Sequence, residues 1–482
     1  MGSAYDQVLY PGFPLAQTHP DRLATIAGLL GMTPAPPDRS RVLELGCGDG
    51  GNLIPMALGL PESQFTGIDL AEQAVATGRA AIQTLGLKNI SLRQMDLLEA
   101  GAGLGEFDYI LAHGLYSWVP PNVRERVLGI CQANLAPHGV AYVSYNAYPG
   151  FHRREMFRGM MLHHVRNVHD PAERYREAVQ LIANLARCAP KSNVARILFE
   201  EQDQYLSETA PWAVYHDDLA HTNRAFSLHE FMTDARRHQL QYLGEADFFE
   251  MQADTYPEPV THALERFAGT DVVAKEQYLD FIKGRRFRQT LLCRNEVVLD
   301  RSLAPERIAE LYVASSARPV SPNPELREGV AEEFRGPRGA ALETACAAAK
   351  IALCRLGEIW PQAIHFPELL HGNDAAQLAG VLIQGYRFGL LELHFLPPQF
   401  ASAAGERPVA SPLARLQMRQ SPVVTTLRHT LVEVDDAMDR RLLTLLDGTR
   451  DRTALAAALG DESGEPIESR LRRLTKEALL VR

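Results

Sequence analysis

The chain has 482 residues, of which 46% are hydrophobic and 22% charged, and its formal net charge is −10. This length provides core for roughly two to four domains, and the acidic balance argues against a general nucleic-acid binder, which needs clustered excess Lys and Arg to neutralise phosphates. The six cysteines show no CxxC pair or metal-ligand spacing, and there is neither a signal pattern nor an apolar run of membrane-spanning length, so we expect a cytoplasmic protein without a metal.

The first informative element is an apolar strand over residues 42–45 that runs into the glycine-spaced turn 46–52 (GCGDGGN). Glu44 lies inside this strand, where a carboxylate repels a pyrophosphate but suits the cationic amino group and sulfonium of S-adenosylmethionine. Gly46 and Gly48 let the backbone approach a ligand closely. Any tight strand-turn-helix unit can carry such glycines, but we predict that S-adenosylmethionine binds here. The predicted contacts are Glu44, Gly46, Cys47, Gly48 and Asn52.

The next three strands end in side chains that suit the same cofactor. The second strand (64–70) ends at Asp69, about twenty residues after the glycines, where a doubly wound sheet places the carboxylate for a ribose diol. The third (90–97) ends at Asp96, which can accept from the adenine amino group, and the fourth (107–114) should open onto the transferring methyl. A single acidic residue at a strand end more often caps a turn or helix than binds a ligand. Three such acids in a chain with this glycine turn favour binding of the cofactor. The predicted contacts from these strand ends are Asp69, Leu70, Asp96, Leu97 and His113.

A fifth strand over residues 139–146 follows a helix (121–135) and a turn (136–139), so strands and helices alternate as in a mainly parallel sheet. A largely helical stretch, residues 151–210, then interrupts the pattern. The elements expected after it are a helix whose capping box is Ser227 and Glu230, a sixth strand over 240–246 and a seventh over 287–294. The expected fold is therefore α/β: a Rossmann-like, seven-stranded class I methyltransferase domain.

We assign this domain to residues 1–300, with a helical insert at about 151–215 that is available for dimerisation or for covering the substrate. Residues 315–338 are rich in Pro, Gly and charge and precede an Ala-rich helix around 340–356, which indicates an α+β middle domain over 301–400.

After a second break at 396–412, a strand and three helices fit a small winged-helix-like module over residues 401–482. The expected strand is 431–435, and the helices are 440–446, 454–459 and 467–480. From residue 425 onward there are 10 Lys and Arg against 11 Asp and Glu. This balance favours protein contact over DNA reading for the module.

The segment after the fourth strand reads HGLYSWVP (113–120) in place of the Asn/Asp-Pro-Pro-aromatic motif that methyltransferases of amides or adenine often carry, so methylation of nucleic-acid bases is disfavoured. Aromatic side chains at or after the ends of the fourth and fifth strands lie where open parallel sheets bind substrates. Their faces can hold an ammonium group with about 0.5–2 kcal/mol, and a desolvated pocket lowers the pKa of a lysine. The candidate catalytic residues are Tyr116, Trp118, Tyr145 and His113, with Tyr148 nearby.

Each of these residues also has a structural interpretation. Trp118 and Tyr145 can be packing aromatics under a loop, and His113 can line the cofactor without acting as a general base. His216 is a weaker candidate of the same kind, because a core or capping histidine would look the same in the sequence.

Three segments closely resemble bacterial class I methyltransferases that carry a methyltransferase regulatory domain: 44–53 (ELGCGDGGNL), 113–120 (HGLYSWVP) and 144–150 (SYNAYPG). The resemblance runs nearly the full length and includes 5–10 (YDQVLY), 18–20 (THP), 228–231 (LHEF), 278–281 (YLDF), 288–292 (RQTLL) and 412–417 (PLARLQ). Characterised members of that family methylate lysines of bacterial outer-membrane proteins and have a catalytic domain, a dimerisation region, a middle domain and a C-terminal domain.

The resemblance therefore implies a lysine N-methyltransferase that acts on a protein or peptide, forms a homodimer and releases S-adenosyl-L-homocysteine. Two alternatives stay open. One is a small-molecule N- or O-methyltransferase whose accessory domains close the site, and the other is a cofactor-binding scaffold that regulates through its C-terminal module.

Overall fold

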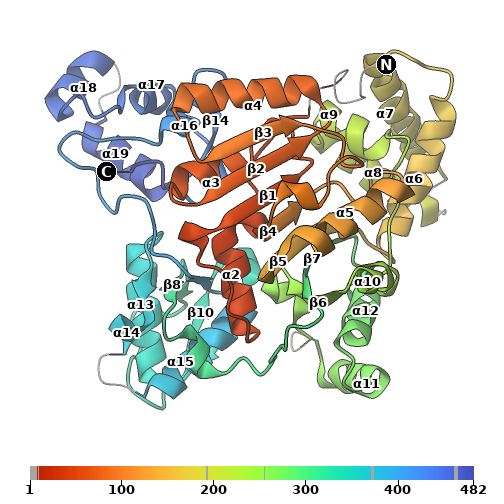
Figure 1. Ribbon diagram of the computed structural model, residues 1–482. Coiled ribbons are helices and arrows are strands. Elements are labelled where there is room, and N and C mark those ends of the chain that lie inside the picture. Colours follow the sequence, from red (N-terminus) through yellow and green to blue (C-terminus); the bar gives the residue numbers. More distant parts are fainter. Residues whose placement is uncertain are drawn as a thin grey trace.

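The computed structural model describes residues 8, 10–190, 194–253, 256–370, 374–460 and 465–481 (Figure 1). Its largest sheet has seven strands in the order β3-β2-β1-β4-β5-β7-β6, in which β7 runs antiparallel to both of its neighbours and the other pairs are parallel. The strands are β1 (Arg41–Leu45), β2 (Gln64–Asp69), β3 (Ile90–Gln94), β4 (Phe107–Ala112), β5 (Leu135–Asn146), β6 (Leu240–Glu245) and β7 (Phe287–Arg294). The predicted Rossmann-like sheet is confirmed.

Helices cover both faces of this sheet, because successive side chains of a strand point to opposite faces. Val42 of β1 packs in one apolar cluster with α2 and α3, whereas its neighbour Leu43 packs in another with α5 and α10. The covering helices are α2 (Pro20–Leu29), α3 (Leu53–Gly59) and α4 (Glu72–Leu85) on one face and α5 (Pro121–Asn134), α10 (Leu228–Arg237) and α12 (Val272–Lys283) on the other. This three-layer arrangement leaves the carboxyl ends of the parallel strands free to form a site.

The predicted helical insert lies between β5 and α10 and has a small apolar cluster of its own around Phe157 and Ile182. It consists of α6 (Phe151–His164), α7 (Pro171–Cys188), α8 (Val194–Glu208), α9 (Pro211–Ala213) and the π-helix η4 (Val214–Asp218). A π-helix is rare and is frequent at functional sites. After the insert, Ser227 caps α10 as predicted, since its hydroxyl oxygen accepts from the backbone N–H of Glu230 at 3.1 Å.

Two local predictions need correction. The predicted turn at 136–139 belongs to β5, which starts at Leu135 and shifts its register against β4. The Ala-rich helix expected from residue 340 starts only at Ala347, because the residues before it form β11 (Ala341–Thr344). This strand pairs antiparallel with β10 (Glu332–Arg335), and the pairing outweighs the weak strand preference of alanine.

The middle region shares its core with the methyltransferase domain. Leu353 and Leu382 belong to the same apolar cluster as Leu23 of α2 and Val42 of β1. The predicted boundary at residue 300 therefore stays a prediction. Its elements, besides β10 and β11, are β8 (Tyr312–Ala314), β9 (Arg318–Pro319), β12 (Ile364–His365), β13 (Glu392–His394), α13 (Ala347–Ile359), α14 (Phe366–Leu369) and α15 (Ala375–Arg387).

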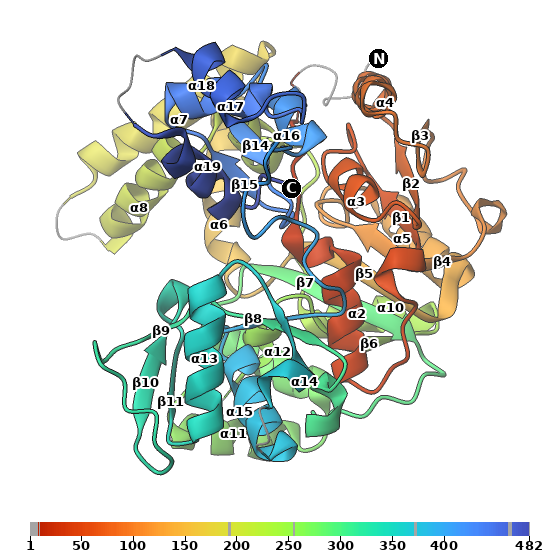
Figure 2. The ribbon, with the colours of Figure 1, turned by 90° about the vertical axis from the view of Figure 1, so that its left-hand side faces the viewer.

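The C-terminal module, from residue 401 onward, has an apolar cluster of its own that includes Leu442 and Leu471. The hairpin of β14 (Val423–Thr425) and β15 (Leu431–Glu433) packs with α16 (Pro412–Gln417), α17 (Ala437–Leu445), α18 (Arg452–Leu459) and α19 (Ile467–Lys476), which confirms a winged-helix-like module. In both views this module lies above the middle region (Figure 1, Figure 2).

Shorter pieces complete the described chain: α11 (Glu258–Ala268) and the 3₁₀-helices η1 (Ala16–Thr18), η2 (Pro37–Arg39), η3 (Ala102–Leu104), η5 (Phe248–Met251), η6 (Pro305–Ile308) and η7 (Pro337–Gly339). Within the ranges given above, no helix has both the length and the apolar character of a membrane span. The same residues contain no cluster of three or more His, Cys, Asp or Glu suited to a metal ion. Of the family-like segment 5–10, only Val8 and Tyr10 lie within the described residues.

Candidate active site

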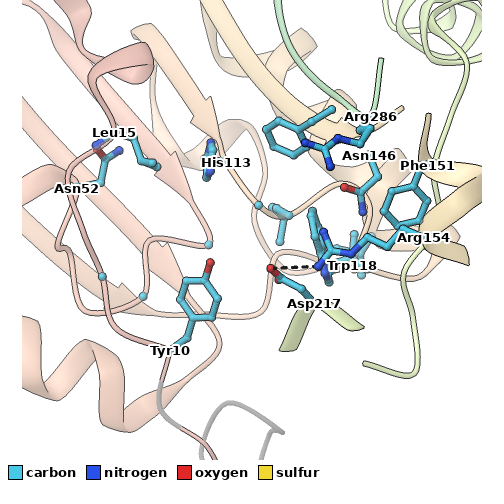
Figure 3. A pocket seen from close by; sticks show the side chains of 18 of the residues that line it. Tyr10, Leu15, Asn52, His113, Trp118, Asn146, Phe151, Arg154, Asp217 and Arg286 are labelled. Carbon is cyan, nitrogen blue, oxygen red and sulfur yellow. Dashed lines mark hydrogen bonds and ion pairs between the residues drawn. The ribbon is translucent and has the colours of Figure 1, made fainter. Parts of the chain in front are cut away.

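A cavity of about 1330 Å³ opens at the carboxyl ends of β1, β2 and β4. Pockets for one small ligand usually measure about 300–1,000 Å³, so this one has room for a cofactor and part of a second molecule. Figure 3 shows Leu15, Asn52 and His113 on one side of it, and Trp118, Asn146, Arg154 and Asp217 on the other. We call these the cofactor side and the acceptor side.

The glycine-spaced turn forms the floor of the cofactor side. Gly46 and Gly48 have φ angles of 75° and 55°, the left-handed region that favours glycine. The backbone N–H groups of Gly46 and Cys47 both donate to the carbonyl of Ile68, which ties the turn to the end of β2. The sequence pattern thus folds into a turn whose backbone faces the cavity.

Glu44 supplies a buried carboxylate to the cofactor side, and the residue is only 4% exposed. Its Oε1 accepts from the Nδ2 of Asn52 at 2.8 Å, but its Oε2 has no hydrogen-bond partner among the described residues. Burial raises the pKa of Glu44 to about 8. A buried polar atom without a partner is costly, and the cationic amino group of S-adenosylmethionine would provide the missing donor. The residues present therefore fit the predicted cofactor.

The carboxylates of Asp69 and Asp96 lie near the ends of β2 and β3, as the sequence predicted. Asp69 accepts from the N–H groups of Gly48 and Ala71, each at 2.8 Å, and these bonds fix the carboxylate at the end of β2. Burial raises the pKa of Asp69. The Oδ1 of Asp96 accepts from the N–H of Leu98 at 2.9 Å. The residues predicted to contact the cofactor all line the cavity: Glu44, Gly46, Cys47, Gly48, Asn52, Asp69, Leu70, Asp96, Leu97 and His113.

His113 lies on the cofactor side of the cavity, directly after β4. Its Nδ1 is 2.8 Å from the hydroxyl of Tyr142, and burial lowers the pKa of its imidazole to about 4. The ring is therefore neutral near pH 7 and is a weak proton acceptor. This favours the cofactor-lining interpretation over the general base.

Two aromatic side chains predicted to meet the acceptor are core residues. Tyr116 is 1% exposed and Tyr145 0% exposed, and both pack against Phe226 and Phe231 beside the sheet. The sequence located them at strand ends correctly but did not reveal which face of the sheet they occupy. They support the wall of the site without lining the cavity.

Trp118 does line the cavity on its acceptor side, and its indole Nε1 is buried without a partner among the described residues. Tyr148 turns away to other partners, since its hydroxyl donates to Glu155 at 2.6 Å and its ring stacks on His152. His216 contacts the backbone carbonyl of Val8 at 2.7 Å and thereby anchors the N-terminal segment.

The insert contributes an acceptor-side residue that the sequence did not reveal, Asp217 of the π-helix η4. Burial raises the pKa of Asp217 to about 6, and within the described chain its carboxylate has one ion pair, with Arg154 at 3.9 Å, and no hydrogen bond. Arg154 is already engaged, because it binds both carboxylate oxygens of Asp218 at 2.7 and 2.9 Å and donates to Tyr205 at 2.8 Å. Asp217 is thus only partly neutralised. The only hint in the sequence was the acidic pair in Tyr-His-Asp-Asp.

The N-terminal segment covers the cavity and was also missed as part of the site. Tyr10, Gly12, Phe13 and Leu15 line the cavity. The backbone N–H of Leu15 donates to the Oδ1 of Asn52 at 3.0 Å, so this cover is fixed to the cofactor turn. Its sequence resembled that of the family but carried no chemical pattern that pointed to a ligand.

Three family models match the chain: a methyltransferase domain over residues 42–139, a "Predicted methyltransferase regulatory domain" over 211–294, and the C-terminal winged helix domain of PKMT over 406–465. The uncharacterized protein RP789 of Rickettsia prowazekii is 31% identical over 97% of this chain and 87% of its own length. A second protein of that organism, RP028, is 31% identical over 50% of this chain and 96% of its own length.

Among solved structures, PKMT2 from Rickettsia typhi in complex with AdoHcy superimposes with a TM-score of 0.85 at 25% identity, covering 98% of this chain and 100% of that one. A second structure of PKMT2 gives the same TM-score at 26% identity. AdoHcy is the demethylated product of S-adenosylmethionine, which agrees with the chemistry of the cofactor side. The chain therefore belongs to the bacterial class I, S-adenosylmethionine-dependent methyltransferases that carry a methyltransferase regulatory domain and a C-terminal winged-helix domain.

Proposed function

We propose that this enzyme methylates the ε-amino group of lysine side chains in a protein. The observation that carries the proposal is the acceptor side of the cavity, where the incompletely neutralised carboxylate of Asp217 faces the same space as Trp118. A carboxylate and an aromatic face together suit an ammonium group on an alkyl chain. The likeness to PKMT2, a protein-lysine methyltransferase by name, supports the same acceptor.

On the cofactor side, we assign the amino group of S-adenosylmethionine to Glu44, its ribose hydroxyls to Asp69 and its adenine to Asp96. When bound, S-adenosylmethionine supplies an electrophilic methyl group on a positively charged sulfur. The neutral imidazole of His113 adds no second positive charge beside it. These residues hold and orient the donor, which is most of what an enzyme contributes to a displacement reaction.

On the acceptor side, Asp217 attracts the lysine ammonium and favours its charged form. Desolvation between Trp118 and the insert acts in the opposite direction and favours the neutral amine that reacts. After the ammonium loses a proton to solvent, the lone pair of the neutral nitrogen would form a bond to the methyl carbon that bound S-adenosylmethionine supplies, and the C–S bond would break. That bonding electron pair goes to sulfur. The methylated nitrogen carries one positive charge until it releases a second proton, and Asp217 faces that charge.

Transfer of labelled methyl from S-adenosylmethionine into a lysate of the source cells, separated into protein and small-molecule fractions, tests the proposal. We expect label in discrete protein bands that mass spectrometry maps to lysine. The control is Glu44→Gln, which should remove labelling by removing the cofactor contact. Label confined to small molecules would instead indicate a metabolite methyltransferase, and tight cofactor binding without any label would indicate a scaffold.

A further inference from the structure

We propose that the C-terminal winged-helix module completes the cofactor site, with His429 as a positioning residue that acts through Asn52 on Glu44. Binding of S-adenosylmethionine and docking of the module are then coupled. The inference rests on the contact of Glu44 with the cofactor amino group and does not depend on which acceptor is methylated.

The first observation is the shape of the hairpin tip. His429 lies between β14 and β15 and has a φ angle of 58°, a left-handed conformation that is uncommon for a residue other than glycine. Three hydrogen bonds between Thr426 and Thr430 hold the tip. The N–H of Thr426 donates to the carbonyl of Thr430 at 2.8 Å, the two hydroxyls lie 2.8 Å apart, and the N–H of Thr430 donates to the hydroxyl oxygen of Thr426 at 3.3 Å. Strained backbone of this kind is retained where the surrounding structure needs the side chain in one place.

The second observation is a continuous chain of hydrogen bonds from the tip to the cofactor side. The side-chain amide of Asn52 has one orientation, because its Oδ1 accepts from the N–H of Leu15 at 3.0 Å and its Nδ2 donates to Glu44 at 2.8 Å. The Nε2 of His429 lies 2.8 Å from the same Oδ1 and must therefore be the donor. His429 is buried at this contact. The module thus stabilises the orientation in which Asn52 supports Oε1 of Glu44 and leaves Oε2 for a ligand.

The third observation is that the neighbouring residues of the hairpin are fixed to the other domains. The Nη2 of Arg428 donates to both carboxylate oxygens of Glu392 on β13 at 2.9 Å, and its guanidinium lies 4.2 Å from the centre of the Trp360 ring. The His19 ring, at the start of α2, packs edge-on against His429 with centroids 5.2 Å apart. The tip is therefore a three-domain junction, and His429 reaches Asn52 only when the module is docked.

Coupling of this kind is reciprocal. If docking of the module raises the affinity for S-adenosylmethionine by some factor, the cofactor strengthens docking by the same factor. A partner protein that pulled the hairpin away would lower cofactor affinity, and this gives the winged-helix module a regulatory use that requires no nucleic acid.

Calorimetric binding to the full-length protein tests the inference with two variants, His429→Ala and His429→Gln. Both keep a Cβ at the strained position, but only glutamine retains an N–H that can reach Asn52. We expect the alanine variant to bind S-adenosylmethionine about tenfold more weakly and the glutamine variant to stay within about twofold of the wild type. The control ligand is 5′-methylthioadenosine, which lacks the amino-acid end and should bind all three proteins equally.

If the alanine variant lost affinity equally for both ligands, His429 would have only a general structural role. Unchanged affinity for S-adenosylmethionine in the alanine variant would also overturn the inference. Because a variant can fail to fold, wild-type hydrogen exchange provides an independent test. We expect S-adenosylmethionine to slow exchange over residues 423–433, and unchanged exchange there would contradict the coupling. None of these measurements uses an acceptor, so a failed lysine assignment would appear separately, in the labelling experiment.

Discussion

Two carboxylates in one cavity illustrate how burial prepares a residue for a positively charged ligand. Burial raises the pKa of both Glu44, on the cofactor side, and Asp217, on the acceptor side. Neither has a full set of protein partners among the described residues. Each becomes better stabilised when a cation arrives, which is a common arrangement in sites that sacrifice some stability for binding.

The variant Glu44→Gln should stabilise the ligand-free protein at pH 8 while abolishing tight binding of S-adenosylmethionine. The pKa of Glu44 is raised from 4.5 to about 8, so the folded state holds an extra proton between these values and stability falls as the pH rises through this window. Glutamine removes that loss, which is on the order of 2 kcal/mol between pH 6 and pH 8. Thermal unfolding at pH 6 and pH 8 checks this, with the exposed Glu62→Gln as control. If the unfolding temperatures of the wild type and of Glu44→Gln changed equally between pH 6 and pH 8, the prediction would be wrong.

The variant Asp217→Asn should raise the KM for a lysine acceptor by about tenfold and leave cofactor affinity unchanged, because it removes the charge but keeps the shape. Initial rates with poly-L-lysine, or with an acceptor found in the labelling experiment, measure the effect. Glu201→Gln is the matched control, since Glu201 lines the same cavity but already pairs with Arg153. A similar rise in the acceptor KM for both variants would indicate a general effect of removing negative charge from the cavity.

At the scale of elements, the π-helix η4 explains why Asp217 reaches the cavity. Arg158 of α6 donates to the carbonyls of Asp217 at 2.9 Å, Asp218 at 2.6 Å and Ala220 at 3.0 Å, so one buried guanidinium holds the irregular turn. A lysine cannot reproduce this fork of donors. The position of the acceptor-side carboxylate therefore depends on a side chain that does not itself line the cavity.

We expect Arg158→Lys to lower the free energy of unfolding by about 1–3 kcal/mol and to accelerate hydrogen exchange over residues 214–220. The acceptor KM should rise while cofactor affinity is retained. Arg153→Lys, an exposed change on the same helix, should alter neither the free energy of unfolding nor hydrogen exchange over residues 214–220. Loss of cofactor binding in Arg158→Lys would mean that the insert supports the whole cavity and not the acceptor side alone.

Local patterns predicted the elements that form the cofactor side. The turn 46–52 and the acids Asp69 and Asp96 are each readable within a few residues, because strand, glycine turn and terminal acid are consecutive in the chain. The strand β11 was missed because its pairing with β10 is tertiary. Tyr116 and Tyr145 were located but not oriented, since which face of the sheet is buried depends on helices distant in sequence.

At the scale of the whole molecule, the contacts that join the domains were beyond the reach of sequence patterns. Asn52 and His429 are separated by 377 positions, and no spacing rule connects them. The apolar cluster that joins the methyltransferase domain to the middle region is similarly non-local. The C-terminal module has its own core, and it meets the rest through Leu413, which packs in that shared cluster, and through polar contacts such as Arg428 with Glu392.

The polar contacts of β13, the strand that carries Glu392 and His394, should weaken in alkaline solution. His394 lies 2.9 Å from Asp21 and 3.4 Å from Glu392, with Arg428 and His19 nearby. Burial opposes its charge, but the hydrogen bonds to Asp21 and Glu392 prevail and raise the pKa of His394 to about 10. Its contribution to stability is therefore complete below pH 6.5 and is lost as the pH rises through about 10.

Limited proteolysis at pH 7 and pH 10 measures this loosening. We expect faster cleavage of the connection over residues 396–411 at the higher pH in the wild type. The change should be smaller in His394→Gln, which has no charge to lose. If the cleavage rates of both proteins rise equally with pH, a titratable group other than His394 controls the loosening.

The contact between Asn52 and His429 also has a consequence for the timing of synthesis. The turn that receives the cofactor is synthesised well before the hairpin that carries the side chain orienting it, because the two residues are 377 positions apart. A nascent chain, or one truncated before the hairpin, would display a finished sheet with an incompletely organised cofactor turn. Full-strength capture of S-adenosylmethionine would then begin only after the C-terminal module has left the ribosome and folded.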